Sequence, residues 1–492
     1  MKFEEFERLS KDYNIIPVYE KITADLSTPV LAYLKLRQKN HFSFLLESVE
    51  GIGRLARYSF IGRNPGTVFY NTGAELTIIE EGQKRSVHQN LFDYLQQAVR
   101  SYRQAKPDDL PYFSGGIVGY LGYENIALIE DVIHLKRSNP ISSPDSIFGI
   151  YDTIIAFDHL KHQIILIHNV NIEKSADLLQ SYQKAKETLA QLRAELKQPL
   201  SHQSDFGVTR FPAETENRRQ FYQQVEQARQ YITDGEVFQM VLSRRFSAAY
   251  RGDLVNVYRA LRTINPSPYM YYMEYGDVVT VIGTSPEDLL KVRDRKASIL
   301  PIAGTRKRGS TPEEDLRMEQ ELLNDPKEMA EHVMLIDLAR NDLGRVSRYG
   351  SVRVTEKINI QRFSHVMHIV SRVEGELQDG KDCIDTLKAA FPAGTLTGAP
   401  KIRAVQLIDS LEQETRNIYG GAIGYIDFSG NLDMCIAIRT FFATKDTIYW
   451  QAGAGIVADS RPELEWKEIN NKAAVLRSAL DYAGGMDEDP GH

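Results

Sequence analysis

Hydrophobic and polar positions along the chain follow two periods, which predicts a mixture of strands and helices. In the first half, β-branched and aromatic runs bounded by Gly, Asn and Asp predict strands at residues 42–48, 58–62, 75–80 and 149–168. Apolar residues at helical spacing predict helices at residues 92–105 and 173–196. The two kinds of element do not alternate as regular βαβ units, so the pattern favours an α+β fold over a doubly wound sheet.

The second half of the chain is richer in predicted helices. A helix over 217–234 ends at Gly235 and precedes a strand over 238–246. Further strands are predicted at residues 279–283, 288–293 and 297–302, and further helices at 311–323, 326–344, 381–390, 400–412 and 462–484.

The segment between the halves is polar, contains two prolines and lacks periodicity. We interpret these residues, 197–216, as a linker or a long surface loop. The expected organisation is therefore an N-terminal part over residues 1–215, a second part over 216–485 and a disordered tail over 486–492.

One short internal similarity connects the two parts. Residues 114–123 (SGGIVGYLGY) resemble residues 419–428 (YGGAIGYIDF), each with a glycine pair followed by Gly-Tyr in a strand-like context. Two explanations remain open: chance similarity between glycine-rich strands, or two related sheets in one sandwich. One short match is far less than a repeat array would show.

Composition narrows the class of protein. The chain has 492 residues, a formal charge of −7, and the hydrophobic and charged content of a globular protein. Mild acidity argues against nucleic-acid binding, and the chain has no 18-residue apolar run that would predict a membrane span. The acidic N-terminus lacks the apolar core of a secretory signal. Two cysteines, Cys383 and Cys435, cannot form a disulfide framework, so we expect a cytoplasmic protein.

Two pairs of glutamates are candidate metal ligands. Glu328 and Glu331 lie in a predicted helix that follows a proline, and so do Glu465 and Glu468. Three-residue spacing places each pair on one face of its helix. Mg²⁺ prefers oxygen ligands and commonly binds one or two carboxylates together with waters. Two solvated helical faces are the alternative, but apolar neighbours such as Trp466 favour partly buried carboxylates.

Several possible anion-binding elements accompany these glutamates. Residues 301–309 (PIAGTRKRG) place three cations after a Gly-Thr pair. Residues 391–401 (FPAGTLTGAPK) form a turn before a predicted helix N-terminus, where free N–H groups favour anions. Arg439 is predicted to lie in a strand, and Lys472 follows the second glutamate pair. Each of these elements alone is equally consistent with an ordinary turn or a surface cation. Taken together, and with Mg²⁺ bound to the glutamates, the elements would bind a small polycarboxylate.

These segments, with residues 330–344 and 452–468, resemble the chorismate-utilising enzymes, and most closely the large subunits of anthranilate synthases. The resemblance runs from residue 45 to residue 473. It implies an α+β sandwich of two large packed sheets with helices outside, and chorismate bound beside Mg²⁺. It also implies that the N-terminal part packs into the same body.

The resemblance implies a role for each matching residue. Glu331 and Glu468 match the Mg²⁺ ligands. Glu328 and Glu465 would contact the ion through water or support the two ligands without contacting the ion. The positions that match substrate binding are Gly304, Thr305, Tyr419, Arg439, Gly453, Ala454 and Gly455, with Lys472 and Thr395 nearby. Glu287 matches the general acid that protonates the departing 4-hydroxyl group, and His368 matches the histidine implicated in pyruvate elimination.

Two positions distinguish members of the family. Isochorismate and salicylate synthases have a lysine where Gln239 stands, because water needs activation by a base whereas ammonia does not. Aminodeoxychorismate synthases have a nucleophilic lysine in place of Ala303. The combination implies ammonia attack ortho to the ring carboxylate, loss of the 4-hydroxyl group and formation of anthranilate. An aminodeoxyisochorismate synthase, a 4-amino-4-deoxychorismate synthase component I and a chorismate or tryptophan sensor without activity are the alternatives.

The resemblance also implies two partners. Cys383 and Cys435 have apolar surroundings typical of core residues, so a separate glutaminase subunit would supply ammonia. Residues 45–48 (LLES) and 265–273 (NPSPYMYYM) match tryptophan-binding elements, and their key residues are Ser48, Pro268, Tyr269 and Met270. Feedback inhibition by L-tryptophan is therefore expected, although a strand end and a proline-rich turn would explain the same residues.

Overall fold

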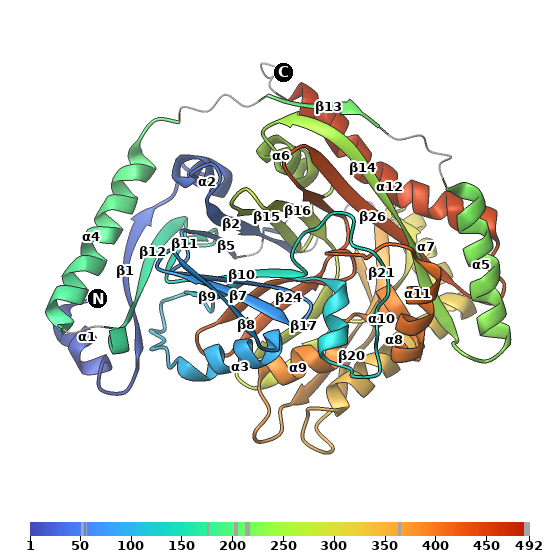
Figure 1. The fold of residues 1–492 in the computed structure, drawn as a ribbon, viewed down its shortest axis with the longest axis horizontal. Helices are drawn as coiled ribbons and strands as arrows, with labels where there is room; N and C mark the ends of the chain where they lie inside the picture. The colour runs from blue at the N-terminus through green and yellow to red at the C-terminus, as the bar shows by residue number, and fades with distance from the viewer. Residues whose placement is uncertain are drawn as a thin grey trace.

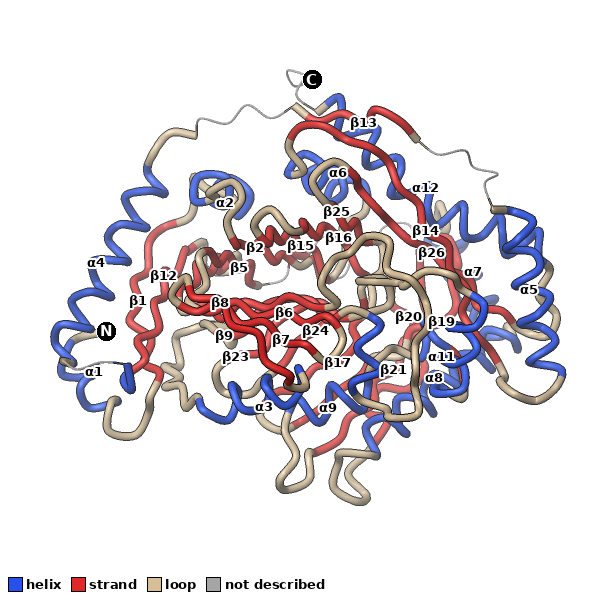
Figure 2. The backbone as a smooth tube through the Cα atoms, in the orientation of Figure 1, coloured by secondary structure: helices blue, strands red, loops and turns tan. Residues whose placement is uncertain are grey.

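The structure is a computed structural model, and it describes residues 1–50, 54–55, 57–174, 177–200, 205–211, 217–362 and 366–486. Two sheets of 12 strands each form its centre, and their paired strands are antiparallel (Figures 1 and 2). The expected α+β fold with two large packed sheets is confirmed.

Sheet I combines strands from both ends of the chain. Its order is β1 (Ile15–Thr23), β12 (Gln163–Asn171), β11 (Thr153–Asp158), β5 (Tyr58–Arg63), β2 (Phe42–Glu47), β15 (Tyr269–Tyr275), β16 (Val279–Ser285), β25 (Thr440–Ala443), β26 (Thr447–Ile456), β14 (Gln239–Gly252) and β13 (Phe206–Arg210). The short strand β22 (Gly398–Ala399) pairs with the start of β14.

Sheet II is built in the same way. Its order is β19 (Ile302–Lys307), β21 (Val366–Glu376), β18 (Lys296–Ile299), β17 (Asp288–Arg293), β24 (Leu432–Ile436), β23 (Ala422–Asp427), β9 (Gly116–Leu121), β10 (Ser146–Tyr151), β6 (Thr67–Thr72), β7 (Glu75–Glu80) and β8 (Gln83–His88). Strand β20 (Arg353–Arg362) pairs with β21. A separate ribbon joins β3 (Val49–Glu50) and β4 (Arg54–Leu55).

The helices form the outer layers. They are α1 (Phe3–Leu9), α2 (Pro29–Leu36), α3 (Leu91–Ser101), α4 (Leu178–Lys197), α5 (Arg218–Thr233), α6 (Val255–Ile264), α7 (Pro312–Asn324), α8 (Pro326–Gly344), α9 (Cys383–Ala390), α10 (Gly394–Thr397), α11 (Lys401–Leu411) and α12 (Pro462–Gly485), with short 3₁₀ turns at Tyr123–Leu128 and Ile172–Lys174.

Three apolar layers hold these elements together. Alternating side chains of both sheets meet between the sheets, where Phe44 and Tyr271 of sheet I share a cluster with Val118 and Tyr425 of sheet II. A second cluster packs α2, α4, α5, α6 and α12 on the outer face of sheet I. A third packs α3, α8 and α9 on the outer face of sheet II. The central strands β9, β10 and β23 are buried on both faces, and their sequences are therefore apolar nearly throughout.

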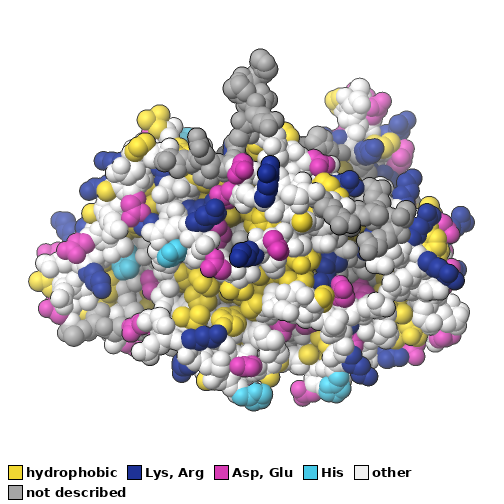
Figure 3. Space-filling view, turned by 45° about the horizontal axis from the view of Figure 1, so that its top comes forward, with side chains coloured by type: hydrophobic (Ala, Val, Ile, Leu, Met, Phe, Trp, Pro, Cys, Tyr) yellow, Lys and Arg dark blue, Asp and Glu magenta, His cyan; other side chains and the backbone are white. Residues whose placement is uncertain are grey.

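The surface is mixed in character. Hydrophobic side chains gather near the centre of the face shown in Figure 3, with charged side chains around them. Among the described residues, no helix is both long and apolar enough to cross a bilayer.

Three predictions from the sequence differ from the structure. Residues 149–168 are not one strand, because the chain reverses between β11 and β12, where His162 has a φ of 50°. Within the predicted linker, residues 206–210 form β13, which pairs with β14. Helix α4 begins only at Leu178, where the Asp177 carboxylate accepts hydrogen bonds from the first turn.

The internal similarity has a simpler structural meaning than two related sheets. Its two segments contribute β9 and β23, which are direct neighbours within sheet II, with Gly119 opposite Gly424. Both cysteines are buried, Cys383 at the start of α9 and Cys435 in β24, as expected of core residues. The predicted tail lies outside the described residues except for Met486.

Candidate active site

Glu287 is the most strongly perturbed carboxyl group among the candidate residues. It lies between β16 and β17, and the Thr395 hydroxyl of α10 donates a hydrogen bond of 2.9 Å to its Oε1. Burial raises its pKa to about 7, and the neighbouring Asp288 adds to this effect, while Thr395, Arg439 and Lys472 oppose it. The carboxyl group can therefore hold a proton near neutral pH and donate it.

Arg439 does not lie in a strand, contrary to the sequence prediction. It occupies the connection in which the chain leaves β24 of sheet II and enters β25 of sheet I, and its φ is 49°. The crossing between the sheets requires a sharp turn that a β-strand cannot make, which explains the left-handed backbone. The Nη1 group of Arg439 donates a hydrogen bond of 3.2 Å to Oδ1 of Asn265.

A bulge brings Gly304, Thr305 and His368 together. The pairing of β19 with β21 shifts register between Ala303 and Arg306. His368 Nδ1 lies 2.9 Å from the Gly304 carbonyl oxygen and 3.1 Å from the Thr305 hydroxyl oxygen. Burial lowers the pKa of His368, so the neutral imidazole predominates at neutral pH.

Gly304 is also required for close packing. Its φ is 65°, and a Cβ atom there would lie 2.8 Å from Cδ1 of Leu322 and 3.1 Å from Oε2 of Glu328. The glycine thus lets the backbone of β19 approach the helices that carry the acidic residues.

Glycines of β26 allow a second close approach. A Cβ atom on Gly453 would lie 2.6 Å from the Tyr419 hydroxyl oxygen, and one on Gly455 would lie 2.9 Å from Nε2 of Gln239. The Gly453 carbonyl accepts a hydrogen bond of 3.0 Å from Lys472 Nζ. The backbone of residues 453–455 is therefore bordered by a phenol, an amide and an ammonium group.

Glu331 of α8 and Glu468 of α12 lie near enough for their charges to interact, although 137 positions separate them in the chain. Burial raises the pKa of Glu331, and the charges of Glu328 and Glu468 raise it further. Burial and the charge of Glu468 also raise the pKa of Glu465. Helices distant in sequence thus place like charges close enough to repel.

Cations partly balance these charges. Arg306 Nη1 lies 3.0 Å from Oε1 of Glu328, and Lys472 Nζ lies 2.7 Å from Oε1 of Glu468. In the part of the chain that the structure describes, no three His, Cys, Asp or Glu side chains are arranged to hold a metal ion together.

The residues matched to tryptophan binding meet where two strands pair. Ser48 follows β2, Tyr269 and Met270 open β15, and Glu47 is the register partner of Met270. The Tyr269 hydroxyl donates a hydrogen bond of 2.8 Å to Asp433. Asn265, the hydrogen-bond partner of Arg439, lies only three residues before Pro268 in the chain.

Sequence reasoning did not single out three residues that border this site. Asp288 follows Glu287 directly and could have been noticed in the SPEDLL string. Asn265 lies in the NPSPY string, which had been assigned only to tryptophan binding. Arg416 follows α11, and only its partner Glu412 is local, because the two carbonyls that it contacts come from distant segments.

The fold is an α+β sandwich whose two large sheets and outer helices carry these residues. A sequence model of the family described as chorismate binding enzyme matches residues 55–478, and the chain belongs to this family.

Similar proteins span almost the whole chain. "Anthranilate synthase component 1" of Aquifex aeolicus is 43% identical over 499 residues, which cover 99% of each chain. The protein of that name from Acetivibrio thermocellus is 44% identical, with 98% of each chain covered. These relatives confirm the resemblance drawn from the motifs.

Solved structures agree with the fold. Anthranilate synthase component I from Streptococcus pneumoniae superposes with a TM-score of 0.75 at 37% identity, covering 93% of this chain and 99% of that one. The isochorismate synthase MenF from Escherichia coli has a TM-score of 0.71 at 21% identity, covering 97% of this chain and 98% of that one, and shares the fold.

Proposed function

We propose that the chain is the large subunit of an anthranilate synthase, which converts chorismate and ammonia into anthranilate and pyruvate. The observation that carries this proposal is the pair Gln239 and Ala303. Gln239 lies against Gly455, and Ala303 is buried in β19. Neither side chain can activate water or attack the ring, so ammonia itself is the nucleophile.

Glu287 and Arg439 fit the first step. Ammonia forms a bond to the ring carbon ortho to the carboxylate, the ring double bonds shift, and the C4–O bond breaks. Glu287 donates the proton with which the hydroxyl group leaves as water. Arg439 suits a bidentate contact with the enolpyruvyl carboxylate. Loss of a ring proton and of pyruvate then gives the aromatic amine, a step to which we assign His368.

Mg²⁺ is the proposed cofactor, and the carboxylates on α8 and α12 fit it. All the donors are hard oxygen atoms, and the mutual repulsion of Glu331 and Glu468 is the kind of cost that a cation relieves. Mg²⁺ usually binds only one or two carboxylates beside waters, so a three-residue cluster is not required. The bound ion would supply positive charge to the ring carboxylate of chorismate. Glu328 and Glu465 would support the two ligands.

A glutaminase subunit is the proposed source of ammonia. Burial raises the pKa of both cysteines, Cys383 and Cys435, which suppresses the thiolate that an amidotransferase needs. L-Tryptophan is the proposed inhibitor at Ser48, Pro268, Tyr269 and Met270, and the cytoplasm is the proposed location.

The test uses the purified chain with chorismate, Mg²⁺ and ammonium at alkaline pH, where free ammonia is abundant. We expect anthranilate, detected by its fluorescence and by chromatography. Pyruvate should form in an equal amount. A non-aromatic enolpyruvyl amine would instead identify an aminodeoxyisochorismate synthase. Chorismate binding without turnover would identify a sensor. Added tryptophan should raise the chorismate concentration needed for half-maximal rate, and no change at millimolar tryptophan would remove the inhibitor site.

A further inference from the structure

Arg416 is the largest fully buried side chain among the described residues, and its guanidinium lies over the ring of Tyr123, 4.6 Å from the centroid. Nη1 donates a hydrogen bond of 2.7 Å to the Leu396 carbonyl, and Nη2 donates one of 2.7 Å to the Val241 carbonyl. Glu412 accepts two more, of 2.8 Å from Nε and 2.7 Å from Nη2. The planar guanidinium therefore satisfies carbonyls and a carboxylate in different directions at once.

Each of these carbonyls belongs to a segment that carries a candidate site residue. Leu396 follows Thr395 in α10, and Val241 lies two positions after Gln239 in β14. In addition, the Tyr419 backbone N–H donates a hydrogen bond of 3.0 Å to the Arg416 carbonyl. One buried side chain thus connects α10, which carries the hydrogen-bond partner of Glu287, with β14, which carries Gln239.

A wider network keeps Arg416 charged. Burial alone would raise the pKa of Glu412, but Arg416 and Arg137 hold it below its usual value. Arg137 also pairs with Glu124 at 3.1 Å and Asp409 at 2.9 Å. The charge of Arg416 is therefore balanced within the fold, independently of any substrate.

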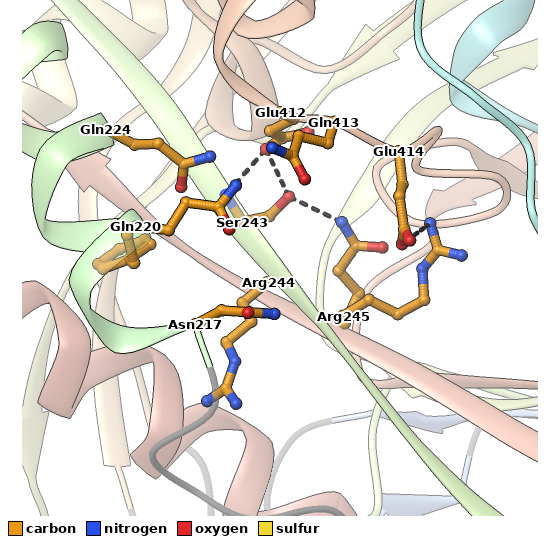
Figure 4. A pocket seen from close by; sticks show the side chains of 11 residues that line it. Asn217, Gln220, Gln224, Ser243, Arg244, Arg245, Glu412, Gln413 and Glu414 are labelled. Atoms are coloured by element: carbon orange, nitrogen blue, oxygen red, sulfur yellow. Dashed lines mark hydrogen bonds and ion pairs between the residues drawn. The ribbon is translucent and has the colours of Figure 1, made fainter.

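The outer end of this network reaches a polar pocket of about 150 Å³ between α5, β14 and β26 (Figure 4). Glu412 accepts hydrogen bonds there from the backbone N–H and the hydroxyl group of Ser243, and Gln451 donates to the same hydroxyl oxygen at 2.8 Å. Glu412 thus lines the pocket, whereas no residue of α10 does. Gln451, which also lines it, is a suitable position for a control substitution.

We propose that Arg416 is a positioning residue, which fixes α10 through the Leu396 carbonyl so that Thr395 keeps its hydrogen bond to Glu287. The role of Glu287 in turnover rests on the proposed function, but the contact itself does not. Without this anchor α10 is free to shift, the Thr395 hydroxyl no longer donates to the carboxylate, and the ionised form of Glu287 loses stabilisation.

The effect has a defined direction. The charged and titratable groups that act on Glu287 are Asp288, Arg439, Lys472 and Tyr419, and Asp342 lines the same small cavity. The Thr395 hydrogen bond lowers the pKa of Glu287 against the dominant effect of burial, so losing the bond raises it. Loss of a hydrogen bond to a charged group corresponds to about one pH unit.

The test compares Arg416→Lys with Thr395→Val. Lysine keeps the charge but cannot reach both carbonyls, which separates position from charge. We expect each variant to raise the pKa of the Glu287 carboxyl by about one pH unit, and the double variant to raise it no further. The readout is ¹³C NMR titration of labelled glutamate, assigned with Glu287→Gln, together with the basic limb of the kcat/KM profile. Gln451→Ala removes a hydrogen bond to Ser243 at the outer end of the network and contacts neither Arg416 nor α10, so it should leave both readouts unchanged.

Three results would overturn the proposal: a folded Arg416→Lys protein with the wild-type titration, shifts that add in the double variant, or an equal shift in Gln451→Ala. If Arg416→Lys does not fold, Arg416→Gln combined with Glu412→Gln removes both charges and is tested in its place, because Arg137 keeps two other carboxylates. The NMR titration needs no turnover. A chain that makes no anthranilate therefore refutes the proposed function while the titration still decides the role of Arg416.

Discussion

Replacing Glu287 by Gln should inactivate the enzyme and stabilise its fold at the same time. The change from the ordinary pKa of 4.5 to about 7 reflects a penalty on the ionised carboxylate inside the protein. At 1.36 kcal/mol for each pKa unit, this penalty is about 3 kcal/mol. Gln keeps the shape and can still accept the Thr395 hydrogen bond, but it never ionises and has no proton to give.

The sign of the stability effect follows from proton binding. Between pH 4.5 and about 7 the unfolded chain loses the Glu287 proton while the folded chain keeps it. The wild-type protein therefore loses stability as the pH rises through this range. Glu287→Gln should gain up to about 3 kcal/mol at pH 8, and the gain should vanish below pH 4.5. Denaturant unfolding at both pH values measures it.

The activity should change in the opposite direction. Loss of a general acid typically costs about 10²- to 10⁴-fold in rate, which we expect in kcat. In the wild type, kcat/KM should fall above pH 7 once rates are expressed per free ammonia, because the acid form of Glu287 disappears. Fluorescence of anthranilate follows the reaction.

Asp288→Asn provides the matched control for Glu287→Gln. The substitution removes a neighbouring charge that raises the pKa of Glu287. The basic limb of the kcat/KM profile of this variant should therefore move to lower pH, while activity at pH 6 persists. The reasoning is refuted if Glu287→Gln retains wild-type kcat, or if it is no more stable than the wild type at pH 8.

Three further substitutions test other parts of the site. Gly304→Ala should destabilise the protein by about 1–3 kcal/mol and raise KM for chorismate, since its φ is 65° and its Cβ would meet a leucine methyl group. Gly350→Ala is its control, because Gly350 has a similar φ of 75° but no neighbouring atom within 4 Å of an added Cβ. Equal losses of unfolding free energy in the two variants, measured by denaturant unfolding, would contradict the packing argument. Asn265→Ala removes the partner of Arg439 and should raise KM by about fivefold with kcat retained; a loss in kcat alone would argue against a ground-state role. Glu331→Gln should weaken Mg²⁺ binding by at least about tenfold in calorimetry, and unchanged binding would remove this residue from the metal site.

The sequence contains most of the information about local structure. Helix α8 begins and ends as its proline, apolar spacing and glycine predict, and α12 follows the same logic. The periodicity of apolar residues indicates which face of a segment is buried, even when the element that packs against that face is not known. It failed at residues 149–168, because strands that bury both faces have no alternation to mark the turn between them.

The chemical types of the candidate site residues were also readable from the sequence. The two glutamate pairs, the Gly-Thr turns and the absence of lysine at residues 239 and 303 are local features, and each follows from residue type and spacing. The family resemblance follows from these motifs alone, and the relatives bear it out.

What the tertiary structure alone decided is how these features meet. The left-handed turn at Arg439 exists because the chain crosses from one sheet to the other there. The raised pKa of Glu287 depends on burial by segments distant in the chain, and Thr395, whose hydrogen bond opposes the rise, is 108 positions away. Arg416 has one partner nearby in the chain, Glu412, but its connection of α10 to β14 has no trace in the local sequence. Local sequence fixes residue types and periodicity, whereas electrostatic and packing energies depend on distances that only strand pairing and sheet packing set.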